Sequence, residues 1–143
     1  MKRIYTITLL VAIGLFFSNC ELDTRENFYF VSLRITDADI PEFFVSNQSH
    51  NMDVTFLRPD SCTYFQGFDV FADENGVTTI VAIGSVLTQE ESCSSIEELL
   101  TDFVTIPVRD VDFYTLRFYI GEDTEGNPLY DEHSVPVIDG TNQ

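Results

Sequence analysis

The sequence predicts an all-β protein, an antiparallel β-sandwich of seven or eight short strands with at most one short helix. Two observations carry this prediction. Most apolar segments after residue 28 alternate apolar and polar residues, which is the period of a half-buried strand. Turn-forming residues separate these segments at intervals of roughly ten residues, as expected of a sandwich and not of alternating strand and helix units.

Three strand patterns begin the predicted domain. Residues 31–36 alternate apolar and polar side chains. Residues 43–45 are apolar and follow Pro41, whose missing N–H suits an edge or a strand start. Residues 52–56 alternate again and stop before the Arg-Pro-Asp sequence at 58–60. Each pattern is short enough to be one strand of a sandwich.

Two longer segments follow, residues 62–72 and 77–87, both rich in aromatic or β-branched residues. The loop between them ends in Asn75 and Gly76. Asn-Gly readily adopts the positive φ angles of a tight turn, so the two segments are predicted to pair as a β-hairpin.

Residues 94–103 form the one stretch with helical character. Ser94 with Glu97, or Ser95 with Glu98, has the spacing of a capping box. Four apolar residues fall at positions i, i+3, i+4 and i+7 of a helix, namely Ile96, Leu99, Leu100 and Phe103. We expect one or two helical turns here, followed by a strand over 103–108. A bulged strand throughout is the alternative interpretation.

The last part of the chain predicts two more strands. Residues 114–120 alternate strongly, with Thr115 and Arg117 on the polar face. A loop of acidic and turn-forming residues at 122–128 leads into the final strand, 129–137. The predicted domain therefore extends from residue 28 to residue 143.

The N-terminal segment has the pattern of a secretory signal peptide. Lys2 and Arg3 give it a positive start, and the 14 residues from Ile4 to Phe17 carry no charge. A helix that spans the hydrocarbon core needs about 20 apolar residues, so export with cleavage is preferred over a permanent membrane helix.

Cys20 lies directly after this apolar segment. The segment resembles the lipobox of bacterial lipoproteins, in which the peptide is cut before a cysteine whose sulfur carries diacylglycerol. Phe17 and Asn19 depart from the usual Leu and Gly or Ala, a variation that the looser lipoboxes of Bacteroidota accept. The resemblance implies a signal peptide at 1–19 and a lipidated tether at 20–27. The alternative is that Cys20 is a buried or disulfide-bonded thiol.

Cys62 and Cys93 are the two remaining cysteines. Disulfides persist in exported proteins, so we expect a bond between them that closes a loop of 32 residues, counting both ends. The alternative is two separate buried thiols. Neither cysteine has a Cys or His two to four residues away, so the spacing does not predict a metal site.

The charge of the exported chain excludes one class of partner. After residue 19 there are five arginines, no lysine and 24 acidic residues, a formal charge of −19. Nucleic acids bind proteins mainly through Lys and Arg, so we expect no nucleic-acid partner. An anionic membrane surface is equally unfavourable, whereas divalent cations and basic proteins are attracted.

Tyr114 indicates which kind of β-sandwich the sequence predicts. Asp110 and Tyr114 form a D-x-x-x-Y sequence that resembles the approach to strand F of immunoglobulin-like (Ig-like) domains, where a tyrosine hydroxyl bonds back to the corner backbone. Leu116 stands where antibody domains carry a cysteine, and the chain contains no tryptophan. The resemblance therefore implies an Ig-like sandwich outside the antibody group. The alternative is a tyrosine simply packed in the core.

Several features together resemble the small Ig-like lipoproteins of Bacteroidota envelopes. They are the signal with Cys20, the Asp-Ser-Cys at 60–62, Cys93, and the sequence from Tyr114 to Asn127. Those proteins mostly lack an assigned activity. The resemblance implies a lipid anchor in the outer membrane, on the cell-surface or the periplasmic side, and Glu21 and Asp23 are compatible with a surface-export signal.

Two acidic loops invite comparison with calcium sites. Asp73 and Asn75 lie in one, and Asp123 and Glu125 lie in the other. Calcium binds six to eight oxygen atoms, which such loops can supply in part. Neither loop matches the spacing of an EF-hand, and both are also explained as hairpin turns. Calcium is the only cofactor that the sequence suggests.

Catalytic motifs are scarce. The two histidines are His50, expected in a solvated polar loop, and His133, expected in the last strand. Ser85 follows a glycine but lacks the G-x-S-x-G pattern of an activated serine. We therefore expect no enzyme. A concave pocket with either histidine beside an acid would favour a small hydrolase instead.

The chain contains 13 Phe and 6 Tyr, more than the core of one small sandwich can hold. Phe28 and Phe30 have the opposite parity to Val31 and Leu33, so they are expected on the other face of their strand. Exposed aromatic side chains in an acidic surface favour a protein partner or, as the second hypothesis, a glycan. The expected function is a non-enzymatic, lipid-anchored binding or accessory module.

Overall fold

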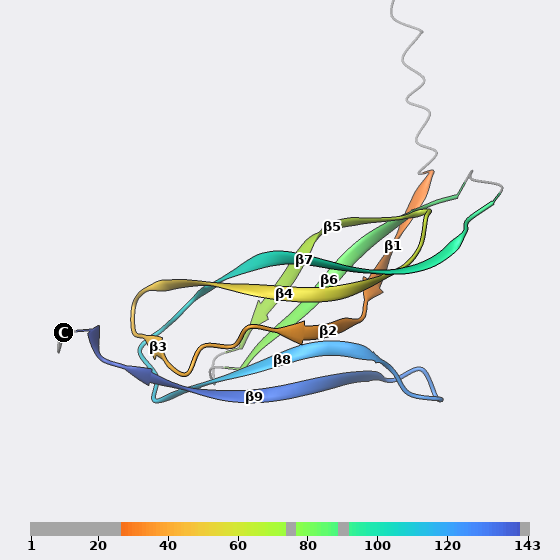
Figure 1. Ribbon diagram of the computed structural model, residues 1–143. Helices are drawn as coiled ribbons and strands as arrows, with labels where there is room; N and C mark the ends of the chain where they lie inside the picture. Colours follow the sequence, from red (N-terminus) through yellow and green to blue (C-terminus); the bar gives the residue numbers. More distant parts are fainter. Residues whose placement is uncertain (1–26, 74–76, 89–91, 141–143) are drawn as a thin grey trace, which may run out of the picture.

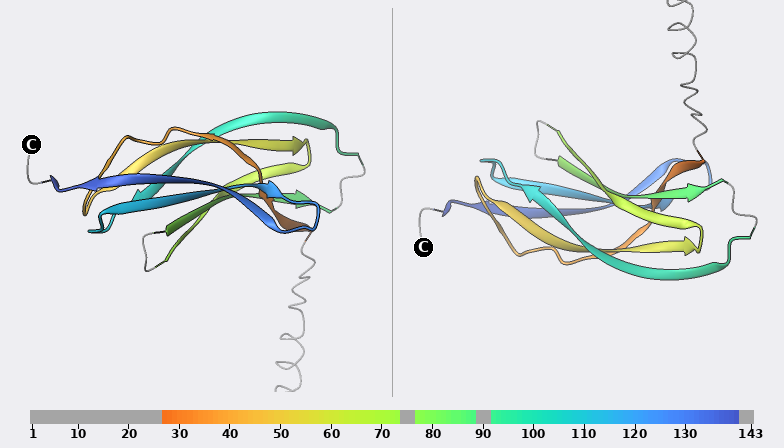
Figure 2. Two further views of the ribbon diagram at one scale, coloured as in Figure 1. Left: turned by 90° about the horizontal axis from the view of Figure 1, so that it is seen from below. Right: turned by 90° about the horizontal axis from the view of Figure 1, so that it is seen from above.

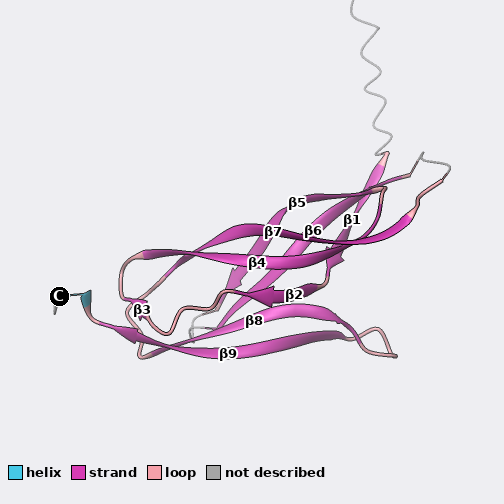
Figure 3. Ribbon diagram, in the orientation of Figure 1, coloured by secondary structure: helices cyan, strands magenta, loops and turns pink. Residues whose placement is uncertain are grey.

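The computed structural model describes residues 27–73, 77–88 and 92–140 of the 143-residue chain. Most of this part is strand (Figure 3). The strands form two layers that face each other, as both views in Figure 2 show. The strands are β1 (Phe28–Leu33), β2 (Ile35–Ala38), β3 (Phe44–Val45), β4 (Ser49–Asp60), β5 (Thr63–Ala72), β6 (Val77–Leu87), β7 (Ser95–Pro107), β8 (Phe113–Glu122) and β9 (Pro128–Ile138).

One layer is a three-stranded sheet with the order β2-β4-β7 (Figure 1). The other is a six-stranded sheet in which β6 is central. β5 pairs along one edge of β6, while β1 and β8 share the other edge, β1 beside residues 82–87 and β8 beside residues 77–80. β9 and then β3 follow outside β8. The predicted β-sandwich is confirmed.

The strand count and the strand directions differ from the prediction. The expected strand at 31–36 is two strands, because the chain leaves the larger sheet at Arg34 and joins the smaller one. The sheets are also not wholly antiparallel, since β6 pairs with β8 and β3 pairs with β9 in parallel. These pairings join segments far apart in the sequence, so no local pattern specifies them.

Residues 94–103 are not helical, and the alternative interpretation of a bulged strand is correct. β7 pairs with β4 along almost its full length. The register runs from Arg58 and Glu98 to Asp60 and Ser95, so β7 carries an extra residue there, and Glu97 has a φ of 42°. Pairing with the apolar strand β4 outweighs the weak helical preference of this short segment.

Both predicted hairpins are present. β5 and β6 pair antiparallel, and the N–H of Val77 donates to Oδ1 of Asp73. The Asn-Gly sequence predicted to form the turn lies outside the described residues. β8 and β9 pair antiparallel across the second acidic turn. These short connections agree with the turn residues in the sequence.

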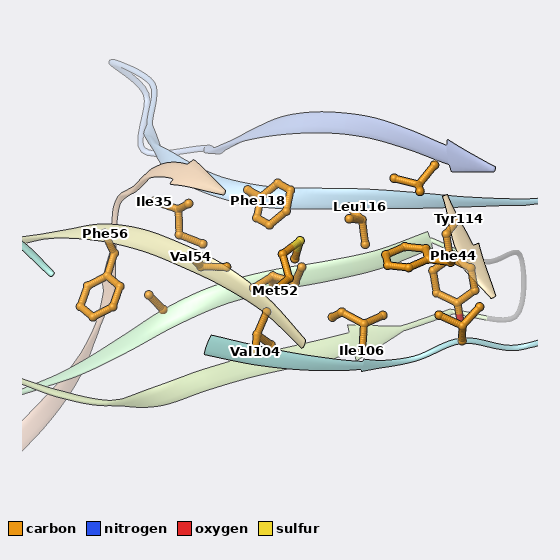
Figure 4. Close-up of a cluster of buried hydrophobic side chains, with 14 of the residues drawn as sticks. Ile35, Phe44, Met52, Val54, Phe56, Val104, Ile106, Tyr114, Leu116 and Phe118 are labelled. Atoms are coloured by element: carbon orange, nitrogen blue, oxygen red, sulfur yellow. The ribbon is translucent and has the colours of Figure 1, made fainter. Parts of the chain in front are cut away.

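The core lies between the two sheets and is built by alternate residues of each strand (Figure 4). Gly84 marks a close approach within it. A Cβ atom on Gly84 would lie 3.0 Å from Cγ2 of Thr63 and 3.2 Å from Cδ1 of Leu33, so a larger residue would push β1 and β5 apart. The largest fully buried side chains are Tyr114, Phe44, Phe56, Met52, Ile80, Ile106 and Leu116.

Cys62 and Cys93 form a disulfide, with Cα atoms 5.4 Å apart. Cys62 is fully buried at the β4–β5 turn, while Cys93 precedes β7. Asp60 supports this turn because its Oδ1 accepts hydrogen bonds from the Cys62 N–H and the Thr63 hydroxyl. The bond therefore links the start of β5 to the start of β7, which lie in different sheets.

Tyr114 makes the corner contact that the sequence predicts. It lies at the start of β8, is 2% exposed, and its hydroxyl donates a 3.0 Å hydrogen bond to the Pro107 carbonyl. The Arg109 N–H donates to the same hydroxyl at 3.2 Å. The hydroxyl thus closes the turn between β7 and β8, and the ring packs edge-on against Phe44.

We expect Tyr114→Phe to lower the free energy of unfolding by about 1–3 kcal/mol, because the corner backbone loses a buried partner while the ring still fills its place. Urea denaturation measures this change. Tyr64→Phe removes the same hydroxyl from a side chain that is 42% exposed and serves as the control. Equal unfolding midpoints for the two variants would contradict the assigned role.

Candidate functional site

The outer side of the six-stranded sheet carries an exposed aromatic face. Phe28 and Phe30 of β1 pair with Leu87 and Ser85 of β6, and the residues of such cross-strand pairs lie on the same side of the sheet. Residues 80 and 82 of β6 are fully buried in the core, so the odd-numbered residues of this strand point outward. We define the aromatic face as Phe28, Phe30, Tyr64, Phe71, Ile83 and Leu87.

Four of these side chains remain well exposed. Phe30 is 64% exposed and Phe71 is 59% exposed, with Tyr64 and Phe28 close to 40%. Phe28, Phe30 and Tyr64 lie beside residues 85–87 of β6, while Phe71 lies further along the same side, beside Thr79. Exposed aromatic side chains on one side of a sheet favour a contact surface. The predicted outward orientation of Phe28 and Phe30 is therefore confirmed.

A groove of about 390 Å³ crosses this face between β1 and β5. A bulge in β5 forms it, because the register passes from Phe65 and Gly84 to Gly67 and Ile83 with Gln66 as the extra residue. Gly67 has a φ of 140°, which a side chain would strain. The lining residues are Phe30, Gln66, Gly67, Phe68, Asp69 and Ile83.

The groove combines an aromatic wall with two polar groups. The side-chain amide of Gln66 donates a 2.9 Å hydrogen bond to the Ser85 hydroxyl, which holds it beside the groove. Asp69 adds a carboxylate on the same side of β5. The volume lies within the range of about 300–1,000 Å³ that is typical of ligand sites. Sequence reasoning missed Gln66 and Asp69, although a glycine inside a strand pattern is a recognised sign of a bulge.

His133 and Asp131 lie together in a second, smaller recess of about 130 Å³, between β2 and the β8–β9 pair. The His133 Nε2 and Asp131 Oδ2 atoms are 2.9 Å apart. The hydroxyl in this recess belongs to Thr36 and donates to the Thr55 carbonyl. This recess is the histidine beside an acid that would favour a small hydrolase, but its lining residues, all described, include no serine or cysteine nucleophile.

His50 is not the solvated loop residue that the sequence suggested. It is half-buried in β4, and the N–H of Val45 donates a 3.0 Å hydrogen bond to its Nε2. Its ring centroid lies 5.0 Å from that of Phe44. His50 therefore holds β3 against β4. The contact depends on the parallel docking of β3 beside β9, which the local sequence does not reveal.

The second acidic turn is held by its own side chains. Asp123 Oδ1 accepts from the N–H groups of Glu125 and Asn127, and Oδ2 accepts from the Asn127 amide. These hydrogen bonds hold the pKa of the Asp123 carboxyl below its ordinary value of 3.8, and the bond from the Asn127 side-chain amide has the largest effect. No group of three or more metal-ligating side chains occurs within the described ranges. Calcium binding at Asp123 and Glu125 stays a prediction, which calorimetric titration with calcium tests.

Two of the predicted site residues lie outside the described residues. They are Cys20, the predicted lipidation site, and Asn75, one member of the first calcium candidate. Its other member, Asp73, accepts the hairpin hydrogen bond from Val77. Along the described part of the chain, no helix is long and apolar enough to span a membrane. Cys62, Cys93 and Tyr114 serve the fold and take no part in the aromatic face.

No protein-family model, curated protein or solved structure matches the chain.

Acid titration tests the role of Asp123. Its pKa is lower in the folded chain, so its contribution to stability is complete above 3.8 and is lost as the pH falls through the lower folded value. We expect Asp123→Asn to lose less stability than the wild type on acidification, as measured by urea midpoints at several pH values. Glu125→Gln, which removes a charge from the same turn, should follow the wild type. Parallel curves for Asp123→Asn and the wild type would contradict this role.

Proposed function

We propose that this chain is a lipid-anchored protein of the bacterial outer membrane whose Ig-like sandwich binds a partner protein or serves as an accessory part of a membrane assembly. Cys20 carries the lipid in this proposal, and the domain acts by binding and not by catalysis. The aromatic face is the observation that carries it, because it presents large apolar side chains on a sheet that no other element of the described chain covers.

The chemistry of this face favours a protein with an apolar centre and a basic rim. Aromatic side chains are enriched in the buried centres of protein interfaces. Asp69 lies on the outer side of β5 and adds a negative charge beside the aromatic side chains. On the neighbouring β8–β9 pair, Arg117 is paired with Glu132 at 2.8 Å, so its positive charge does not offset that of Asp69. With a formal charge of −19 after residue 19, the chain also attracts basic partners from a distance.

A glycan is the second candidate ligand, and the groove is the observation that favours it. Its Phe30 wall can stack on the apolar face of a sugar, while Gln66 and Asp69 can hydrogen-bond to hydroxyl groups. A glycan array separates the two hypotheses. Binding of a defined sugar would favour the glycan, and an array without signal would remove it.

Truncation of an aromatic side chain tests whether the aromatic face binds the partner. Phe71→Ser removes a side chain from this face, and Phe103→Ser removes an equally exposed one from the smaller sheet, since both phenylalanines are 59% exposed. We expect Phe71→Ser to weaken partner recovery from solubilised envelopes by about tenfold or more. Phe103→Ser should recover the partner as the wild type does. Loss in Phe103→Ser alone would assign binding to the other sheet.

Metabolic labelling with a radioactive fatty acid tests the anchor. We expect label on the wild type and none on Cys20→Ala, because the thiol of Cys20 is the proposed attachment point. The double variant Cys62→Ser, Cys93→Ser should keep the label, which distinguishes acylation of Cys20 from acylation of another cysteine. Label that persists in Cys20→Ala would overturn the anchor.

A further inference from the structure

Three consecutive aromatic residues, Phe28, Tyr29 and Phe30, begin the first strand and are all exposed. Their exposed fractions are 40%, 54% and 64%. Phe28 and Phe30 contact each other edge to face, with ring centroids 5.3 Å apart, on the outer side of the sheet. Tyr29 projects from the other side of the strand, opposite Val86. The strand thus presents aromatic rings on both sides at its N-terminal end.

Strand register places this aromatic end at one extreme of the domain. Val77 of β6 lies beside Thr115, near the start of β8, while Leu87 lies beside Phe28. The ten residue steps from Val77 to Leu87 span about 33 Å of strand. In Figure 1 the start of β1 and the start of β8 accordingly lie at opposite ends of the sandwich. Phe113, 60% exposed, begins β8 at the far end.

The length of chain before β1 limits how far this end can lie from a lipid on Cys20. Phe28 lies eight residue positions after Cys20. A fully extended chain of that length reaches about 28 Å, and a flexible one has a mean span of about 15 Å. The aromatic end is therefore the part of the described domain that the anchor holds nearest to the bilayer.

The chemistry of the aromatic end suits the headgroup region of a bilayer. Aromatic rings, tyrosine especially, concentrate at the boundary between apolar chains and water. The charges at this end select the lipid. Glu122, Asp123 and Glu125 lie in the β8–β9 turn, which the parallel β6–β8 register directs toward the same end as Phe28. These carboxylates disfavour an anionic surface and leave a zwitterionic one as the occupant.

We propose that Phe28, Tyr29 and Phe30 form a second membrane contact, which seats the anchored end of the domain in the headgroup region of a zwitterionic bilayer. The inference rests on the proposed lipidation of Cys20. A second contact fixes the orientation of the domain, which attachment through one lipid-modified residue alone does not determine. The opposite end, with Phe113, then points away from the membrane. Phe28 and Phe30 of the aromatic face belong to the membrane contact in this arrangement, and Tyr64 and Phe71 of β5 remain exposed for a partner.

The absence of tryptophan from the sequence allows a clean experiment. Phe30→Trp and Phe113→Trp each introduce a single fluorescent reporter at positions of similar exposure, at opposite ends of the domain. The full-length variants are expressed with their signal, purified with the membrane lipid attached, and inserted into phosphatidylcholine vesicles. Mass spectrometry reports acylation of Cys20 independently. Brominated phosphatidylcholine then quenches any tryptophan that reaches the bilayer.

We expect a blue-shifted emission and loss of fluorescence for Phe30→Trp, and neither change for Phe113→Trp. Replacing part of the lipid with phosphatidylglycerol at low salt should reduce the quenching of Phe30→Trp, and added salt should restore it. An acylated protein in which Phe30→Trp is not quenched, or in which both reporters are quenched equally, would overturn the membrane contact while leaving the lipid anchor intact. A mass without acyl chains would instead overturn the anchor, and the contact with it.

Discussion

The chain passes from the larger sheet to the smaller one at Arg34. The burial of Leu33 and Ile35, on either side of this crossing, determines how the sandwich is built. Leu33 ends β1 in the larger sheet and Ile35 begins β2 in the smaller one, yet the two side chains are 3% and 2% exposed and enter one core. Side chains of a strand alternate in direction, so a buried Leu33 requires Phe28 and Phe30 to face outward. The chain cannot bury these rings without exposing Leu33.

The outer surface of the domain follows from the same alternation in the neighbouring strands. Burial of Ile80 and Ala82 in β6 turns Ile83 outward, and the bulge at Gln66 opens the groove beside it. Close packing holds this arrangement, because Gly84 leaves no room for a side chain between β1 and β5. The aromatic face, which includes Phe28 and Phe30, is thus a consequence of how the core is built, and the short tether places the β1 end of this face nearest the proposed anchor.

Local sequence patterns predicted the features that depend on neighbouring residues. Alternation predicted most strands, Asn75 and Gly76 predicted the hairpin, and the spacing of Asp110 and Tyr114 predicted the corner hydrogen bond. The parallel β6–β8 pairing, the strand at 95–107 and the recess at His133 depend on which distant strands meet. The entropy of loop closure and the free energy of burying apolar surface decide which distant strands pair. Neither quantity can be read from a short window of the sequence.

The proposed orientation of the domain on a membrane is most directly tested by nuclear magnetic resonance of the acylated wild-type protein on zwitterionic nanodiscs with spin-labelled headgroups. A spin label broadens the amide signals of nearby residues and leaves distant ones sharp. With the β1 end seated in the headgroup region, the signals of Tyr29 and Phe30 broaden while that of Phe113, at the opposite end, stays sharp. Equal broadening at both ends, or broadening of Phe113 alone, would contradict a domain oriented by the rings that its core leaves exposed.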